Sequence, residues 1–330
     1  MKPYIVICEK FSIEAQVTLT SSLKSSNLAE VVKLSSLDEL ADHLPKATAL
    51  IIRSKTKITR ELIAAAPNLN LIITCTSGFD HIDLQATQEK NIHVMYTPTA
   101  NAQSAAELAW GLILNTHRPI LDSHKQIKAG LWDREKLSPG FELAGRTIGI
   151  VGLGRIGQKI ATFAKAFSMN VVAFDPYQED EVFEHFKLER SSYEELLKQS
   201  DIITFHVPLT KETKNMLNRS HYEYTTKDVV IINASRGSVV NEDDLCEALD
   251  EGEVRMAGLD VFAKEPLSRE SKLLKSSKVI LTQHIGAMTE QAFAKASMEA
   301  ATLCIDFLKT NKTQNSLPFK NNWGSLMFND

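Results

Sequence analysis

Residues 147–167 read TIGIVGLGRIGQKIATFAKAF, and this stretch decides the fold of the chain around it. An apolar run ends in Gly152, Gly154 and Gly157, which have the spacing GxGxxG, and an amphipathic helical pattern follows. A second apolar run then ends at Asp175. A strand, a glycine turn, a helix and a second strand with a terminal acid predict a dinucleotide-binding site.

Each residue of this motif has a distinct expected role. Gly152 permits the tight turn, Gly154 lets the backbone approach a pyrophosphate, and Gly157 lets the helix pack closely on the strand. The amino terminus of the helix supplies free N–H groups and positive potential for the phosphates. Asp175 would accept hydrogen bonds from both ribose hydroxyls and repel a 2′-phosphate, so we expect NAD rather than NADP. The alternative is a simple glycine turn with a surface aspartate.

Outward from this stretch, short apolar strands alternate with helical segments in both directions. The expected strands before it are YIVIC, EVVKL, ALIIR, LNLIITC and IHVMYT; those after it are NVVAFDP, DIITFHVPL, DVVIINASRG, RMAGLDVF and KVILTQH. Long helices are expected from about Asn101 to His117 and from about Thr289 to the loop at Asn311. Residues 314–330 are expected to be a loosely structured tail. The alternation predicts an α/β fold of two doubly wound parallel-sheet domains.

The composition narrows the classes of function. The 330 residues suffice for two domains, and 43% hydrophobic with 24% charged residues is typical of globular proteins. The net charge of −4, without a basic block, argues against a nucleic-acid partner. The apolar run at the start is too short before Glu9 and Lys10 for a signal peptide, and no run approaches membrane-spanning length, so we expect neither. Four scattered cysteines lack zinc spacing, so we expect reduced thiols, no metal site and a cytoplasmic location.

Three later strands end in residues that suit hydride-transfer chemistry. Arg236 closes one strand, Asp260 and Glu265 follow the next, and His284 closes the last. The carboxyl ends of parallel strands form the ligand crevice. Oxidation of a 2-hydroxy acid needs a histidine-like base, a carboxylate that orients the imidazole, and a guanidinium that binds the substrate carboxylate. We therefore predict that Arg236, one of the acids and His284 are catalytic; the alternative for His284 is a core histidine bonded to a carbonyl.

Six motifs make the chain resemble the NAD-dependent D-isomer-specific 2-hydroxyacid dehydrogenase family over about residues 49–308. They are GLGRIGQKIA, FDPY, HVPLTKETKNML, INASRGSVVNEDDL, GLDVFAKEPL and TQHIGAMT. The resemblance implies that Arg236 binds substrate, that Glu265 pairs with His284, and that His284 is the acid/base. Gln283 stands where the family usually has proline, which adds an N–H but deletes no catalytic group.

The motif and the resemblance together imply a set of cofactor contacts along the second half of the chain. The expected NAD-binding residues are Gly152, Gly154, Arg155, Ile156, Gly157, Asp175, Pro176, His206, Val207, Pro208, Thr213, Ala234, Ser235, Asp260, His284 and Gly286.

The resemblance also implies how the domains divide. Residues 1–98 and 288–330 would form a flavodoxin-like substrate domain, and residues 99–287 a Rossmann-type NAD-binding domain. The helix from Asn101 and the arm GLWDREKLSPGFEL at 130–143 would form the interface of a homodimer or a homotetramer. An ordinary packed helix with a surface loop is the alternative.

The loop TCTSGFDHIDL is expected to face the nicotinamide and to bind the substrate carboxylate through its backbone N–H groups. The residues expected to do so are Ser77, Gly78 and Phe79. Within the family the chain is most similar to D-3-phosphoglycerate dehydrogenases, which implies that Arg53 helps hold the substrate. Arg134 and Lys136 would reach a phosphate, since a cationic clamp suits a phosphate dianion. Against this, Thr74 stands where that subfamily has an arginine.

The expected reaction is hydride exchange between NAD and D-3-phosphoglycerate or 3-phosphohydroxypyruvate, a step of serine biosynthesis. Because the chain ends soon after the catalytic core, we expect no regulatory domain and no serine feedback. Reduction of hydroxypyruvate or glyoxylate is the alternative activity, and D-lactate is further behind. A non-enzymatic NAD-sensing interaction protein is the alternative of another class. The expected partner is thus a small 2-hydroxy or 2-keto acid, with no nucleic acid and no membrane.

Overall fold

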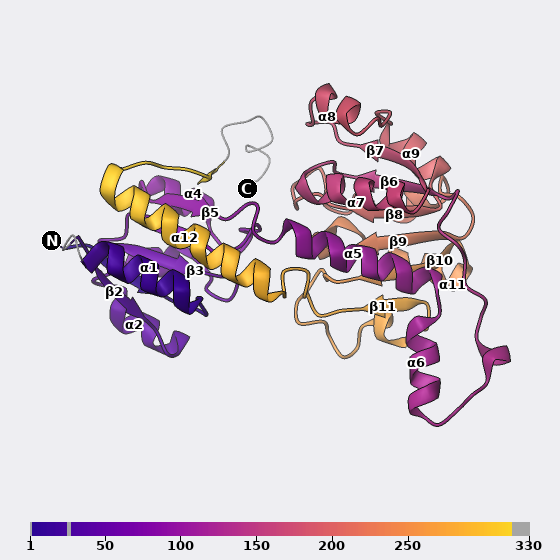
Figure 1. Ribbon diagram of the computed structural model, residues 1–330, viewed down its shortest axis with the longest axis horizontal. Helices are drawn as coiled ribbons and strands as arrows, with labels where there is room; N and C mark the ends of the chain where they lie inside the picture. Colours follow the sequence, from indigo (N-terminus) through magenta and orange to yellow (C-terminus); the bar gives the residue numbers. More distant parts are fainter. Residues whose placement is uncertain (1, 25–27, 319–330) are drawn as a thin grey trace. The chain divides into compact units, whose positions relative to one another are not determined.

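The computed structural model describes residues 2–24 and 28–318. Contacts between Cα atoms divide the chain into two compact units. We call them unit 1, Met1–Ala102 with Ala287–Asp330, and unit 2, Gln103–Gly286. Each unit is a sheet with helices on its faces (Figure 1).

The sheet of unit 1 has six strands in the order β2-β1-β3-β4-β5-β12. They are β1 (Tyr4–Ile7), β2 (Glu30–Lys33), β3 (Ala49–Ile52), β4 (Leu71–Thr74), β5 (His93–Tyr96) and β12 (Ser316–Leu317). The first five strands are parallel, and their order 2-1-3-4-5 is the flavodoxin-like arrangement. The expected strands are therefore all present.

The prediction of a loosely structured tail is wrong for Ser316 and Leu317. Ser316 and Leu317 pair antiparallel with β5, and the Tyr96 N–H donates to the Asn315 carbonyl at 3.1 Å. Leu317 is buried in the core beside Val94. The pairing satisfies backbone groups that the edge strand β5 would otherwise expose. Residues 319–330 of the predicted tail lie outside the described residues.

Helices cover both faces of this sheet. Those of unit 1 are α1 (Ile13–Lys24), α2 (Leu40–His43), α3 (Arg60–Ala65), α4 (Leu84–Glu89) and α12 (Glu290–Thr310), with a 3₁₀ turn at Leu37–Glu39. Helices α1 and α12 lie side by side over the face that carries Ile5 and Ile51 (Figure 1). The opposite face carries Val6 and Leu50 and packs against α2, α3 and α4. Burial on both faces explains why these strands are continuous apolar runs.

The sheet of unit 2 is wholly parallel, in the order β7-β6-β8-β9-β10-β11. Its strands are β6 (Thr147–Val151), β7 (Asn170–Phe174), β8 (Ile202–Phe205), β9 (Val229–Asn233), β10 (Val254–Leu259) and β11 (Val279–Leu281). A single parallel bridge joins Ala173 of β7 to Arg190. Counted as a strand, it completes the order 3-2-1-4-5-6-7, the Rossmann order extended by one strand. The predicted fold class is confirmed.

Unit 2 also has helices on both faces. They are α5 (Ala102–His117), α6 (Ile120–Lys128), α7 (Arg155–Ala166), α8 (Asp180–His185), α9 (Tyr193–Gln199), α10 (Arg219–Tyr222) and α11 (Glu242–Glu251), with 3₁₀ turns at Arg134–Lys136, Gly237–Val239 and Lys272–Lys275. Helices α5, α7 and α8 pack against Ile148 and Ile232, whereas α9, α10 and α11 pack against Phe205 and Ile231. Among the described helices, none combines the length and apolar character needed to cross a membrane.

Candidate active site

His284 and Glu265 form a hydrogen-bonded pair at the carboxyl end of the sheet in unit 2. Their Nδ1 and Oε2 atoms lie 2.8 Å apart. The other carboxylate oxygen of Glu265 accepts a hydrogen bond from the Phe262 N–H at 3.1 Å, so its own loop holds it in place. Half of the His284 side chain is exposed. A carboxylate on Nδ1 favours the tautomer whose Nε2 can accept a proton, which is the arrangement of an acid/base histidine.

Hydrogen bonds to Asp260 stabilise the segment that carries His284. His284 has φ of 56°, in the left-handed region, and its N–H donates to the Asp260 carbonyl at 2.8 Å. The Asp260 carboxylate accepts hydrogen bonds from Thr282 Oγ1 at 2.6 Å, from Ile285 N at 2.9 Å and from Gly286 N at 2.9 Å. Asp260 is 1% exposed. It therefore stabilises the unusual backbone conformation of the histidine itself.

Arg236 follows β9, next to the loop that holds Glu265. A Cβ atom on Gly237 would lie 1.8 Å from the carbonyl carbon of Phe262, so the two loops pack backbone against backbone and only glycine fits. The Nη1 of Arg236 donates to the Ser235 carbonyl at 2.7 Å. Strands β9, β10 and β11 are neighbours in the sheet. The three predicted catalytic residues thus follow three adjacent strands of one unit.

The glycine loop has the geometry that its motif predicts. Gly152 has φ of 94°, and a Cβ there would lie 2.6 Å from the His206 carbonyl oxygen. A Cβ on Gly157 would lie 2.1 Å from the Gly152 carbonyl oxygen, whereas one on Gly154 would meet nothing within 4 Å. Gly154 is also the N-cap of α7 and has no side chain to cap the helix. The loop therefore leaves open space and backbone N–H groups where phosphates would bind.

Asp175 follows β7 and lies over the glycine loop. Its carboxylate accepts hydrogen bonds from Leu153 N at 2.9 Å and from Tyr177 N at 3.0 Å. Arg190, whose backbone bridges to β7, is the nearby cation that could bind a 2′-phosphate. Its guanidinium instead donates to the Asp175 carbonyl at 2.6 Å and pairs with Asp180 at 2.7 Å. This arrangement favours NAD over NADP.

The other predicted cofactor residues also follow strands of unit 2 or begin α7. Those not yet placed are Arg155 and Ile156 in the first turn of α7, Pro176 after β7, Val207, Pro208 and Thr213 after β8, Ala234 and Ser235 after β9, and Gly286 after β11. Thr213 Oγ1 donates to the Pro208 carbonyl at 2.6 Å, which closes the turn after β8. His206 Nε2 lies 2.9 Å from Thr204 Oγ1, and burial lowers the pKa of His206 to about 3. This imidazole is therefore neutral.

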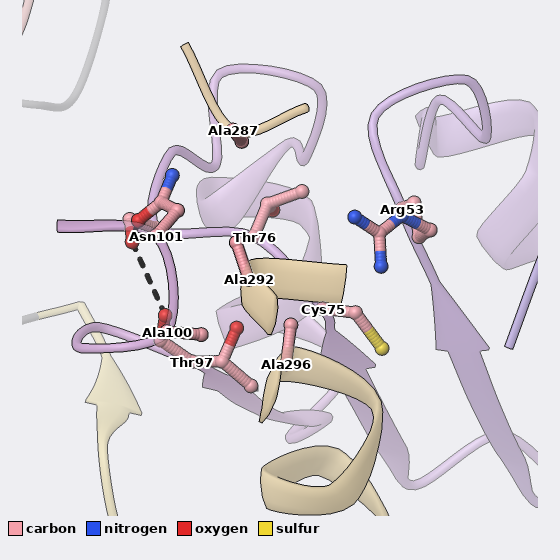
Figure 2. A pocket seen from close by; sticks show the side chains of 10 residues that line it. Arg53, Cys75, Thr76, Thr97, Ala100, Asn101, Ala287, Ala292 and Ala296 are labelled. Carbon is pink, nitrogen blue, oxygen red and sulfur yellow. Dashed lines mark hydrogen bonds between the residues drawn. The ribbon is translucent and has the colours of Figure 1, made fainter. Parts of the chain in front are cut away.

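The predicted substrate residues of unit 1 follow β3 and β4. Arg53 comes after β3, and Ser77, Gly78 and Phe79 come after β4. The Ser77 hydroxyl donates to the Asn101 side chain and, at 3.2 Å, to the Thr97 carbonyl, and Phe79 packs edge-on against an aromatic ring of β5. Figure 2 shows the pocket that Arg53 and Ser77 help to line.

Arg134 and Lys136 belong to the 3₁₀ turn in the arm of unit 2. Lys136 pairs with Asp133 at 2.8 Å and is largely exposed. Both residues lie on a different unit from Arg53 and on no strand end.

Two residues that sequence reasoning missed stand out in unit 1. Glu9 follows β1, and its Oε1 accepts hydrogen bonds from Arg53 N at 2.9 Å and from Thr56 N at 2.9 Å and Oγ1 at 2.8 Å. Thr97 lines the pocket of Figure 2 and is 0% exposed. An acid directly after the first strand is a signal that could have identified Glu9, whereas nothing in the sequence singles out Thr97. Within residues 2–24 and 28–318, no three His, Cys, Asp or Glu side chains are grouped for a metal ion.

Comparison with known proteins agrees with this geometry. The family model described as "D-isomer specific 2-hydroxyacid dehydrogenase, NAD binding domain" matches residues 110–286. The chain is 37% identical over 313 residues to a D-3-phosphoglycerate dehydrogenase of Archaeoglobus fulgidus, which covers 95% of this chain and 59% of that protein. It is 40% identical over 264 residues to a hydroxypyruvate reductase of Thermotoga maritima, which covers 79% and 85%.

A solved structure is similar over nearly the whole chain. The D-lactate dehydrogenase of Aquifex aeolicus, complexed with NAD and lactic acid, has a TM-score of 0.81 at 28% identity and covers 93% of this chain and 95% of its own. The chain spans about half the length of the phosphoglycerate dehydrogenases it matches. The predicted cofactor and family are confirmed. The chain belongs to the family of NAD-dependent D-isomer-specific 2-hydroxyacid dehydrogenases, with its NAD-binding domain at residues 110–286.

Proposed function

We propose that this chain is an oxidoreductase that exchanges a hydride between NAD(H) and C2 of a small 2-hydroxy or 2-keto acid. The observation that carries the proposal is the 2.8 Å pair of His284 and Glu265, which lies beside the loop of Arg236 at the carboxyl ends of three adjacent strands. A histidine whose Nδ1 is held by a carboxylate and whose ring is half exposed suits proton transfer to a substrate.

Each group has one role in this reaction. His284 Nε2 takes the proton of the C2 hydroxyl in oxidation and returns it to the oxygen in reduction, and Glu265 stabilises the imidazolium that forms. Arg236 binds the substrate carboxylate through its planar guanidinium. NAD, when bound, accepts or supplies the hydride. Asp260 keeps the histidine segment in its left-handed conformation and so positions the base.

We also propose a division of labour between the domains. Residues 99–287 bind NAD through the glycine loop and Asp175 and supply Arg236, and residues 1–98 with 288–330 supply the other contacts to the substrate. Three features support it: the open space at Gly154, the uncapped amino terminus of α7, and the pocket of unit 1 with its arginine.

The substrate that we propose is D-3-phosphoglycerate with its product 3-phosphohydroxypyruvate. The Arg53 guanidinium lies 5.1 Å from the centre of the Phe293 ring, and its enclosed Nη1 has no partner among the described residues. A fixed cation with a spare donor suits a phosphate. The similarity to the Archaeoglobus fulgidus enzyme supports this choice.

Reduction of hydroxypyruvate or glyoxylate is the second candidate. Thr74 is buried and bonds to Thr76 at 2.5 Å, so it adds no cation to Arg53. A single arginine suits a substrate without a dianion, and the relative from Thermotoga maritima is a hydroxypyruvate reductase.

Steady-state kinetics with NADH and four keto acids test the proposal. We expect the highest kcat/KM for 3-phosphohydroxypyruvate, then for hydroxypyruvate and glyoxylate, and the lowest for pyruvate. Arg53→Ala should raise KM for the phosphorylated acid more than for hydroxypyruvate. Arg60→Ala, in the same unit but paired with Glu89 on the surface, is the control and should change neither. If the protein turns over none of the four acids, the hypothesis that remains is an NAD-sensing interaction protein.

We further propose that the chain forms a homodimer in the cytoplasm through α5 and the arm at 130–143. The arm and the neighbouring α6 expose large apolar side chains, among them Trp132, which is 82% exposed, Leu131 and Ile127. All four cysteines are free and buried, which suits a reducing compartment. Light scattering should give twice the chain mass, and Trp132→Glu should shift it toward the monomer.

A further inference from the structure

The hydroxyl of Thr97 is a buried polar group of unit 1 with no role so far. Thr97 is 0% exposed, and its Oγ1 has no hydrogen-bond partner among the described residues. Its backbone is satisfied, because its N–H donates to the Thr76 carbonyl and its carbonyl accepts from Ser77 Oγ. Burying an unpartnered hydroxyl costs free energy that a valine of the same shape would not cost. We therefore expect a ligand group that forms a hydrogen bond with this hydroxyl.

The surroundings of this hydroxyl form a pocket rather than a packed core. Figure 2 shows Thr97 and Arg53 among the lining side chains, together with Ala292 and Ala296 of α12. Because alanines line this wall, space remains next to the hydroxyl. Burial raises the pKa of the Cys75 thiol, on another wall, to about 12, so this thiol is neutral. The pocket thus offers polar donors but no reactive side chain.

The donors of the pocket determine which ligand chemistry fits. Arg53 Nη1 is enclosed without a partner and can only donate, whereas Thr97 Oγ1 can donate or accept. Both groups are satisfied by oxygen atoms and neither by an alkyl group. In the proposed function Arg236 binds the substrate carboxylate, and His284 exchanges a proton with the oxygen on C2. The oxygen that reaches Thr97 must then belong to the substituent on C3.

We propose that Thr97 is a specificity residue, whose hydroxyl binds an oxygen-bearing substituent on C3 of the substrate and so rejects 2-keto acids with an alkyl group there. This inference rests on the proposed function and adds to it the residue that distinguishes the two substrate classes. A site built to hydrogen-bond a substrate oxygen rejects the analogue without it, because the buried group of the site is then left unpartnered. The oxygen is that of a phosphate ester or of a free hydroxyl.

Hydroxypyruvate and 2-oxobutyrate test the proposal, because the second has a methyl group where the first has a hydroxyl. We expect the wild type to prefer hydroxypyruvate in kcat/KM, and Thr97→Val to reduce this preference by about tenfold, the value of one hydrogen bond. Thr97→Ser should keep the preference. A parallel series with 3-phosphohydroxypyruvate shows whether the phosphate or the hydroxyl is the group recognised. An unchanged preference in Thr97→Val would overturn the proposal.

Thr87→Val is the matched structural control in the same unit. Thr87 is 1% exposed, but its hydroxyl donates to the Leu84 carbonyl at 2.8 Å. We expect Thr87→Val to lower the midpoint of thermal unfolding and to leave the substrate preference unchanged. Thr97→Val should leave the midpoint unchanged or raise it by about 2 °C, since it removes an unpartnered group. A lower midpoint in Thr97→Val would show that the hydroxyl is already satisfied and would contradict the inference.

A binding measurement separates the failure of this inference from the failure of the proposed function. Absence of turnover with every keto acid would reject the proposed function alone. In that case hydroxypyruvate should still raise the unfolding midpoint of the wild type more than that of Thr97→Val, and 2-oxobutyrate should affect the two proteins alike. Equal stabilisation of wild type and Thr97→Val by hydroxypyruvate would reject the role of Thr97.

Discussion

The two units begin with the same topology and use its first turn in opposite ways. In each unit the order of strands reverses beside the first strand, which is β1 in unit 1 and β6 in unit 2. Open α/β sheets bind ligands at the point where the strand order reverses. In unit 2 the first strand leads into a glycine loop and into α7, whose N-cap Gly154 has no capping side chain. In unit 1 the corresponding turn contains Glu9 and Ser12, and the Ser12 hydroxyl accepts a hydrogen bond from Ala15 N in the first turn of α1.

The carboxylate of Glu9 in unit 1 accepts hydrogen bonds from the turn after β3. Besides Arg53 and Thr56 it accepts a hydrogen bond from Lys55 N at 3.4 Å, so one protein carboxylate serves the whole turn after β3. In unit 2 the backbone donors around Gly154 are left for phosphates. The comparison teaches that topology selects the position of a site, and that the residues after the first strand decide whether the amino terminus of the next helix is capped by a side chain, as by Ser12, or left open to a ligand, as at Gly154.

The largest expected effect tests whether proton transfer belongs to unit 2. His284→Ala should lower kcat by about 100-fold or more, the usual scale for a general acid/base, because no other group replaces the pair with Glu265. The affinity for NADH, measured by fluorescence, should not change. His124→Ala, an exposed histidine of α6, is the control. An unaltered kcat in His284→Ala would remove the distinction between a catalytic unit 2 and a recognition unit 1.

Acid should destabilise unit 2 through two buried histidines. Burial lowers the pKa of His117 to about 4 and that of His206 to about 3, against an ordinary value near 6.5. Below pH 6.5 the unfolded chain therefore binds these protons and the folded chain does not. Each histidine should reduce the free energy of unfolding by about 1.4 kcal/mol per pH unit as the pH falls toward the folded pKa.

Hydrogen exchange at pH 7 and pH 5, corrected for intrinsic rates, would measure this loss in each unit. Protection in the strands of unit 2 should fall at pH 5, and His117→Gln should reduce the fall. Equal protection of unit 2 at the two pH values would contradict the assignment of neutral buried imidazoles.

Asp175→Ala should relax the preference for NADH over NADPH. The carboxylate after β7 accepts hydrogen bonds from Leu153 N of the glycine loop and from Tyr177 N, and it would repel a 2′-phosphate. We expect the ratio of kcat/KM for the two cofactors to fall by about tenfold, the value of about 1.4 kcal/mol. Asp122→Ala, on the exposed surface of α6, should leave the ratio as it is. The same ratio in both variants would mean that Asp175 does not select the cofactor.

The smallest expected effect concerns the other turn of the comparison. Glu9→Gln keeps the shape of the side chain but removes the charge that the N–H groups of Arg53 and Thr56 donate to. We expect KM for the keto acid to rise by about fivefold, with kcat and the KM for NADH nearly unchanged. Glu14→Gln, exposed on α1, is the control. If the KM values for both substrates rise together, Glu9 stabilises the whole chain rather than the position of Arg53.

Strands with a long apolar run could be predicted from the sequence, whereas pairings that involve only one or two residues could not. Eleven strands were expected from their apolar runs and all are present, because strands buried on both faces need such runs. The strand at Ser316–Leu317 and the bridge at Arg190 were missed. One or two residues have no periodicity, and only the open edge of β5 or β7 makes them pair.

The sequence by itself determined the α/β fold, the glycine loop, and the residue types that carry the chemistry, since each depends on local spacing along the chain. Only the tertiary structure decided that Asp260 braces the histidine, that Glu9 holds the Arg53 turn from 44 residues away, and that the Thr97 hydroxyl is buried without a partner. These roles depend on which donors and acceptors meet when distant strand ends come together. Such a hydrogen bond forms only when the fold brings its donor and acceptor together, so it cannot be read from the neighbouring residues in the sequence.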